Sequence, residues 1–121
     1  MEIWNNPSCS KCAVAREMLD DAGVGYEVRP YLDQPPSAAE LAGVLDRLGM
    51  QPWDITRMNE PRAIELALSD APRDRDAWIA VLVENPVLIQ RPILLTDDGR
   101  AVVARTTEAV RSAMEQPPSD R

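Results

Sequence analysis

The chain has 121 residues, with 13 basic and 20 acidic side chains and a net charge of −7. This length is typical of one domain with a single hydrophobic core. The chain contains no histidine, which excludes a Ser-His-Asp triad, a Cys-His dyad and a histidine metal site. Its two cysteines cannot complete a four-thiolate zinc site, so no metal is expected. The acidic balance argues against nucleic-acid binding through phosphate contacts.

Neither an export signal nor a membrane span is expected from the sequence. Residues 1–5 have no basic region and no apolar run of the kind that begins a signal peptide. No stretch approaches the roughly 20 apolar residues that cross a bilayer. We therefore expect a cytoplasmic protein, in a compartment where thiols are kept reduced. A cysteine pair in that compartment is more typical of catalysis or redox sensing than of a structural disulfide.

The first thirty residues are predicted to form a strand, a helix and a second strand. Residues 1–5 alternate in polarity, which favours a short strand, and the residues after them are typical of a turn. Apolar residues at helical spacing follow from Ser10, and Gly23 suits the end of that helix. Residues 25–30 favour a second strand. This order is a βαβ unit.

The middle of the chain is predicted to be a helical insertion over about residues 36–85. Ser37 begins a capping box before an amphipathic stretch that ends at Gly49. Pro61 is predicted to open a further helix that extends through Leu68. The remaining elements are expected in this order: a short helix or turn over 52–57, a helix from Asp74 to Asn85, paired strands over 93–96 and 100–104, and a helix capped by Thr106 or Thr107 that extends through Met114.

Both cysteines fall where the first strand gives way to the first helix, in the motif Cys9-Ser-Lys-Cys12. The free N–H groups and the partial positive charge at a helix start favour a thiolate, and Lys11 adds positive charge nearby. We therefore predict that Cys9 is a nucleophile. Cys12 lies one turn later, within reach of a disulfide, and is predicted to displace whatever Cys9 has bound. For Cys12, a purely structural role as a small buried side chain stays open.

Several motifs of this chain resemble those of the glutaredoxin-coupled arsenate reductase family, which has a thioredoxin-like fold. They occur in the same order as in that family: Asn5-Asn-Pro-Ser-Cys9, residues 31–37, Arg57 within residues 55–60, residues 84–89, and Gln90-Arg-Pro-Ile93. The resemblance covers residues 1–114, expected to be a single domain, and residues 115–121 are expected to be a flexible tail. It implies an α/β fold with a mixed four-stranded sheet flanked by helices.

The resemblance also implies a substrate. The cysteine at the position of Cys9 attacks arsenate in that family, forms a thiol–arsenate adduct and leads to arsenite. Three arginines of the family bind the oxyanion, and Arg57, Arg91 and Arg105 match them. Arg57 and Arg91 match within clear motifs, whereas Arg105 matches only by its place after the last strand.

Further expected site residues surround the cysteines. Ser10 and Lys11 at the helix start are expected to help bind the substrate, because N–H donors and positive charge suit an oxyanion. Pro92 matches the proline that thioredoxin-like folds keep in the cis form beside the active-site cysteine. Asn5 stands where the family usually has histidine, so a titrating side chain is missing there.

The electron donor is implied by the resemblance only in part. Single-cysteine members take electrons from glutathione and glutaredoxin, whereas a second cysteine allows an internal disulfide that thioredoxin, a mycoredoxin or another thiol reduces. We thus expect a monomer with no bound cofactor, an external thiol reductant and a redoxin partner. Two alternatives stay open: an Spx-type redox-sensing transcription regulator that binds the RNA polymerase α subunit, and a related thiol oxidoreductase with another substrate.

Overall fold

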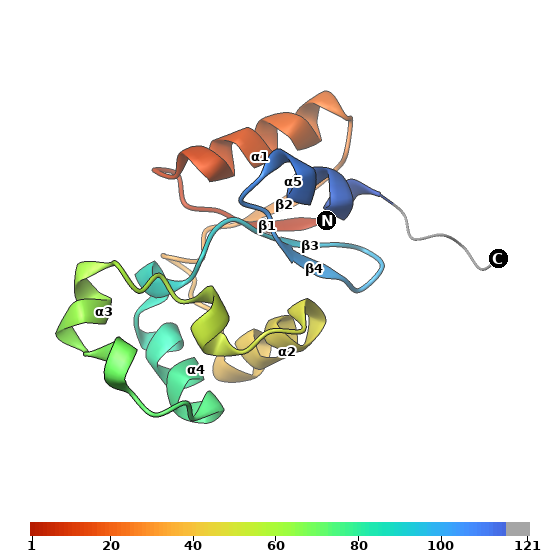
Figure 1. Ribbon diagram of the computed structural model, residues 1–121. Helices are drawn as coiled ribbons and strands as arrows, with labels where there is room; N and C mark the ends of the chain where they lie inside the picture. Colours follow the sequence, from red (N-terminus) through yellow and green to blue (C-terminus); the bar gives the residue numbers. More distant parts are fainter. Residues whose placement is uncertain (116–121) are drawn as a thin grey trace. The chain divides into compact units, whose positions relative to one another are not determined.

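A four-stranded mixed sheet forms around the first strand of the chain. In the computed structural model, which describes residues 1–115, the strand order is β2-β1-β3-β4 (Figure 1). The strands are β1 Glu2–Trp4, β2 Glu27–Arg29, β3 Ile93–Leu95 and β4 Ala101–Val103. β1 pairs in parallel with β2 and antiparallel with β3, and β3 pairs antiparallel with β4. The parallel pair confirms the predicted βαβ unit, and β3 with β4 confirms the predicted hairpin.

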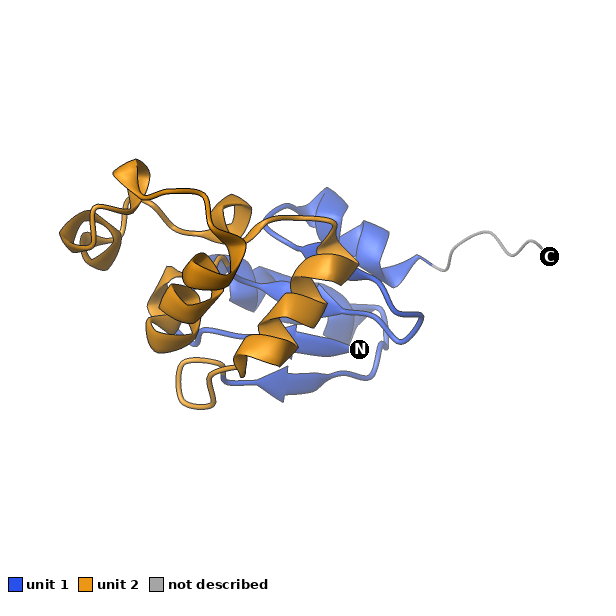
Figure 2. Cartoon of the chain, turned by 90° about the horizontal axis from the view of Figure 1, so that it is seen from below, with its two compact units in different colours: residues 1–30, 91–121 blue, residues 31–90 orange. Residues whose placement is uncertain are grey.

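The chain divides into two compact units, shown in different colours in Figure 2. Unit 1 contains residues 1–30 and the chain from residue 91 onward, and unit 2 contains residues 31–90. Unit 2 includes the predicted helical insertion. The single domain over residues 1–114 stays a prediction, and the predicted tail lies outside the described residues except for Glu115.

Two helices of unit 1, α1 (Ser10–Asp21) and α5 (Thr107–Met114), lie on the same face of the sheet (Figure 1). Their apolar side chains pack on the central strands β1 and β3. The core of this unit draws on all four elements and on the residue after β4: Ile3, Ala15, Leu19, Leu94, Ala104, Val110 and Ala113. Burial of a large apolar side chain stabilises a fold by ~1.5–3 kcal/mol. This packing fixes α1, and therefore the residues of its first turn.

Helix α1 begins and ends close to the predicted positions. Cys9 is its N-cap, with extended backbone angles of φ −97° and ψ 121°. At the other end, Gly23 has a φ of +71°, and its N–H donates to the carbonyl of Asp20 over 3.0 Å. Glycine adopts this left-handed conformation without strain, so the helix ends here.

Unit 2 is helical. Its two longer helices, α2 (Ala38–Leu48) and α4 (Arg75–Glu84), contact each other. Ser37 caps α2 as predicted, because its hydroxyl oxygen accepts a hydrogen bond from the N–H of Glu40 over 3.0 Å. The remaining elements are short: η1 Pro52–Ile55, α3 Pro61–Glu65, η2 Leu68–Asp70 and η3 Pro86–Leu88. No helix within residues 1–115 is both long enough and apolar enough to cross a bilayer.

The predicted helix from Pro61 through Leu68 is wrong in its second half. α3 ends at Glu65, and Ala67 then adopts a left-handed φ of 53°. This turn sends Leu68 into the interior, where it is 4% exposed, and leaves Ile64 69% exposed. The apolar spacing of the sequence therefore reflects two separate short elements, α3, which buries Ala63, and η2, which buries Leu68.

Candidate active site

The two cysteines lie at the first turn of α1, directly after β1 and the turn that follows it. Cys9 is partly buried at the N-cap, and Cys12 is fully buried within the helix. Both are free thiols. The sequence prediction therefore holds for their place in the fold, on the same helix start and one turn apart.

Asn6 holds the turn that carries the cysteines. Its side-chain Oδ1 accepts a hydrogen bond from the N–H of Ser8 over 2.9 Å, and its carbonyl accepts one from the N–H of Cys9 over 3.0 Å. Its own N–H donates to Cys12 Sγ over 3.4 Å. Asn6 is buried, and sequence reasoning missed it. The Asn6-Pro7 pair indicates a turn in the sequence. Which cysteine sulfur the Asn6 N–H faces depends on the conformation of that turn, which the sequence does not give.

The environment of Cys9 favours the thiolate. Burial alone would raise the pKa of Cys9, but several donors outweigh it. In order of effect they are the N–H of Cys12, the side chain of Arg91, the thiol of Cys12 and the N–H of Lys11. Together they lower the pKa of Cys9 from its ordinary value of 9.0 to about 7. A large fraction of Cys9 is therefore a nucleophilic thiolate at neutral pH.

The environment of Cys12 favours the neutral thiol. The pKa of Cys12 is raised to about 11, chiefly by burial and against the opposing effect of the Asn6 N–H. The hydrogen bond and the negative charge of Cys9 contribute to this rise, and the charge of Arg91 acts against it. The pair is therefore asymmetric, with a thiolate at the helix mouth and a protonated thiol behind it.

Arg91, whose side chain helps to lower the pKa of Cys9, also has buried hydrogen-bond donors without a partner. Its Nε and Nη1 are buried and have no hydrogen-bond partner within residues 1–115. Buried donors without a partner are rare in proteins, and a guanidinium group matches the oxygens of an oxyanion. The Arg91–Pro92 peptide bond is cis, in agreement with the resemblance, and Pro92 is buried. This constellation can hold an oxyanion against a thiolate.

The other expected residues of unit 1 contribute in different ways. Arg105 donates from Nη1 to the carbonyl of Arg91 over 2.6 Å, so it supports the backbone of that arginine. Asn5 is buried, and its Oδ1 has no hydrogen-bond partner within the described part of the chain. Ser10 and Lys11 are exposed at the start of α1. Among residues 1–115, no three carboxylate or thiol side chains cluster closely enough to hold a metal ion.

Arg57 belongs to unit 2 and is held by residues of that unit. Its Nε lies 3.3 Å from Glu60 Oε1, and its Nη1 donates to Gln90 Oε1 over 3.3 Å. Its backbone N–H donates to the carbonyl of Leu88 over 2.7 Å. The expected role of Arg57 in oxyanion binding stays a prediction.

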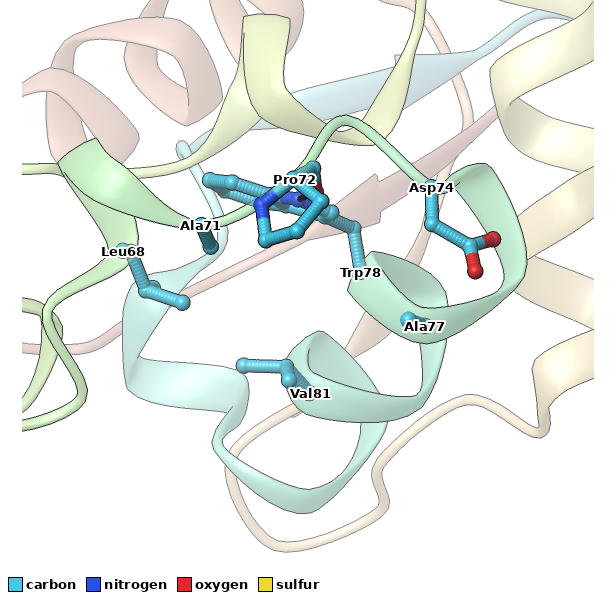
Figure 3. Close-up of a pocket in the computed structure, with 7 residues that line it drawn as sticks. All are labelled: Leu68, Ala71, Pro72, Asp74, Ala77, Trp78 and Val81. Carbon is cyan, nitrogen blue, oxygen red and sulfur yellow. Dashed lines mark hydrogen bonds between the residues drawn. The ribbon is translucent and has the colours of Figure 1, made fainter.

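A pocket of about 190 Å³ opens between η2 and α4 of unit 2 (Figure 3). Trp78 donates from Nε1 to the carbonyl of Pro72 over 2.8 Å at its edge. The lining is mostly apolar and includes no thiol and none of the expected site residues: Leu68, Ala71, Pro72, Asp74, Ala77, Trp78 and Val81. We therefore place the candidate active site at the cysteines.

Comparison with known proteins identifies the family to which the chain belongs. The model of the ArsC family matches residues 4–113. The chain is 56% identical over 117 residues to an uncharacterized protein in the glnII region of Streptomyces viridochromogenes, covering 94% of this chain and 98% of that protein. It is 33% identical over 115 residues to an arsenate reductase of Neisseria meningitidis serogroup A, with 94% and 97% covered.

The solved structures give the same result. An arsenate reductase from Vibrio cholerae superposes with a TM-score of 0.82 at 32% identity, over 94% of this chain and 96% of that one. The chain belongs to the ArsC family. The predicted α/β class, with a mixed four-stranded sheet flanked by helices in a thioredoxin-like fold, is confirmed.

Proposed function

We propose that this protein is an arsenate reductase in which Cys9 is the nucleophile. The observation that carries the proposal is the juxtaposition of the Cys9 thiolate with the two unpartnered donors of Arg91. A thiolate repels anions in general, so a site that pairs one with buried guanidinium donors suits an electrophilic oxyanion. The names of the relatives from Neisseria and Vibrio support arsenate as that oxyanion.

The first step joins the Cys9 sulfur to arsenic. The Cys9 thiolate attacks arsenic, so that an S–As bond forms while one As–O bond breaks, and the departing oxygen leaves as water with both of its protons from the substrate. Arg91 holds the remaining oxygens, and Arg105 keeps the Arg91 backbone in place. The N–H groups at the start of α1, at Lys11 and Cys12, face the reacting sulfur.

The second step oxidises the thiols and reduces arsenic. The Cys12 sulfur gives up its proton and attacks the Cys9 sulfur, so that an S–S bond forms as the S–As bond breaks. The electron pair of the broken bond stays on arsenic, which leaves as arsenite. An external thiol reductant, delivered by a redoxin, then restores both thiols by disulfide exchange. The proposal involves no bound cofactor.

Arsenite production by the purified protein tests this proposal. Wild-type protein with arsenate and a thiol-reducing system is expected to produce arsenite. Cys9→Ser should reduce the rate to that of the reaction without protein. Arg91→Ala should raise the arsenate KM by about tenfold to hundredfold, because it removes charge-assisted hydrogen bonds. Arg111→Ala, which removes an exposed arginine of α5, is the matched control and should leave both constants unchanged. Full activity of Cys9→Ser would refute the proposal.

A further inference from the structure

The proposed chemistry requires a thiolate at Cys12, and the surroundings of Cys12 disfavour that charge. Cys12 has to become a thiolate in order to attack, yet it is fully buried. A buried negative charge is unfavourable unless a donor or an opposite charge stabilises it. While Cys9 is itself a thiolate, it disfavours a second charge beside it. This obstacle weakens once the Cys9 sulfur is bonded to arsenic or to another sulfur.

One hydrogen bond supports a charge on Cys12, namely the one from the Asn6 N–H to Cys12 Sγ at 3.4 Å. The direction of this N–H depends on the turn, which the Asn6 side chain closes through Oδ1 and the N–H of Ser8. The carbonyl of Asn6 accepts from the N–H of Cys9. A single buried residue therefore contacts the helix start at both cysteines.

We propose that Asn6 is the positioning residue for the second thiol: its side chain fixes the turn in which its backbone N–H stabilises the attacking sulfur of Cys12. This inference rests on the proposed function for its place in the arsenate cycle. Its chemistry, however, applies to any leaving group on Cys9. Asn6 acts through Cys12, so its loss should slow the second thiol step much more than the first.

An aromatic disulfide reagent separates the two steps without arsenate. With 5,5′-dithiobis(2-nitrobenzoate), the Cys9 thiolate forms a mixed disulfide and releases one thionitrobenzoate. Cys12 then attacks the Cys9 sulfur, the internal disulfide forms, and a second thionitrobenzoate and the Cys12 proton are released. Absorbance of the released thiolate reports both rates. Cys12→Ser should show the first release alone.

The side chain of Asn6 is varied in this assay. Asn6→Ala removes the oxygen that closes the turn, and we expect the second release to slow about tenfold while the first changes less than about threefold. Asn6→Ser keeps a shorter oxygen acceptor and should give an intermediate second rate. Asn59→Ala, which removes an exposed asparagine of unit 2, should leave both rates unchanged.

Equal slowing of both releases, or an unchanged second release, would overturn the role of Asn6. If Asn6→Ala does not fold, as judged by circular dichroism, the Asn6→Ser protein decides by the same comparison with wild type. The outcome is independent of the proposed function. A protein that shows the selective effect but makes no arsenite would retain the role of Asn6 and refute arsenate reduction.

Discussion

Two cysteine side chains three residues apart differ strongly in pKa in this protein. Cys9 sits at the mouth of α1, among backbone N–H groups and beside Arg91, and its pKa is about 7. Cys12 is buried one turn later, and its pKa is about 11. The difference comes from position alone, because burial disfavours both thiolates and only Cys9 has enough donors to overcome it. Position thus assigns the order in which the two thiols react.

The rate of Cys9 alkylation should follow this difference. We expect the rate of reaction with iodoacetamide to rise with pH with a midpoint near 7, because the pKa of Cys9 is lowered to about 7. Cys12 should stay unmodified in the native protein at neutral pH. Cys12→Ala removes a donor to the Cys9 sulfur and should move the midpoint upward. Mass spectrometry of the alkylated peptides measures both sites, and a midpoint near the ordinary value of 9.0 would contradict the assigned environment.

At the scale of the elements, the residue at the start of a helix decides which groups the free N–H donors of its first turn can bind. The core behind α1, which includes Leu19 and Leu94, holds the helix in place on the sheet. The same principle applies to α5, where two adjacent threonines both suit an N-cap by sequence. The structure selects Thr106, whose hydroxyl oxygen accepts from the N–H of Ala109 over 3.1 Å.

Substitution of each threonine tests this selection. Thr106→Ala should lower the free energy of unfolding by ~1 kcal/mol, because it leaves an N–H of the first turn without its partner. Thr107→Ala removes a hydroxyl that does not cap the helix, and it should change stability by less than about half as much. Urea unfolding followed by circular dichroism gives both values. Equal effects of the two substitutions would show that the cap is shared.

At this scale, the sequence predicts features that depend on neighbouring residues and misses those that depend on the folded structure. Ser37 could be placed because a cap depends on residues three apart in the chain, and Cys9 because a strand, a turn and a helix follow one another without a gap. The end of α3 could not, because the left-handed turn at Ala67 depends on the burial of Leu68. The role of Asn6 could not be predicted for a similar reason, since it rests on backbone hydrogen bonds and not on the position of Asn6 in a sequence motif.

At the scale of the whole molecule, an acidic protein contains a site suited to an anion. The net charge is −7, yet buried guanidinium donors and helix N–H groups converge on Cys9. Charges within a few ångströms act more strongly than distant ones that water and salt screen. The net charge therefore does not predict the charge of the substrate, although it does affect which other molecules the rest of the surface attracts or repels.

The identity of the electron donor is a property of the whole protein, and the second cysteine predicts it. If the product of a cycle is a Cys9–Cys12 disulfide, thioredoxin or a mycoredoxin with two thiols should sustain arsenite production without glutathione. Cys12→Ser should abolish that activity and leave turnover dependent on glutathione and glutaredoxin. Arsenite formation with each donor system distinguishes these cases. An unchanged donor preference in Cys12→Ser would contradict the resolving role of Cys12.

The division of the chain into units has a consequence for how the protein is made. β1 is a central strand, and its partner β3 is separated from it in sequence by all of unit 2. A ribosome therefore finishes the middle segment before the sheet of unit 1 can close. Arg91, which helps to lower the pKa of Cys9, emerges only after that segment. Until then the nascent chain lacks one of the groups that lower the pKa of Cys9, so the thiol reaches its full reactivity only after the middle segment has been made.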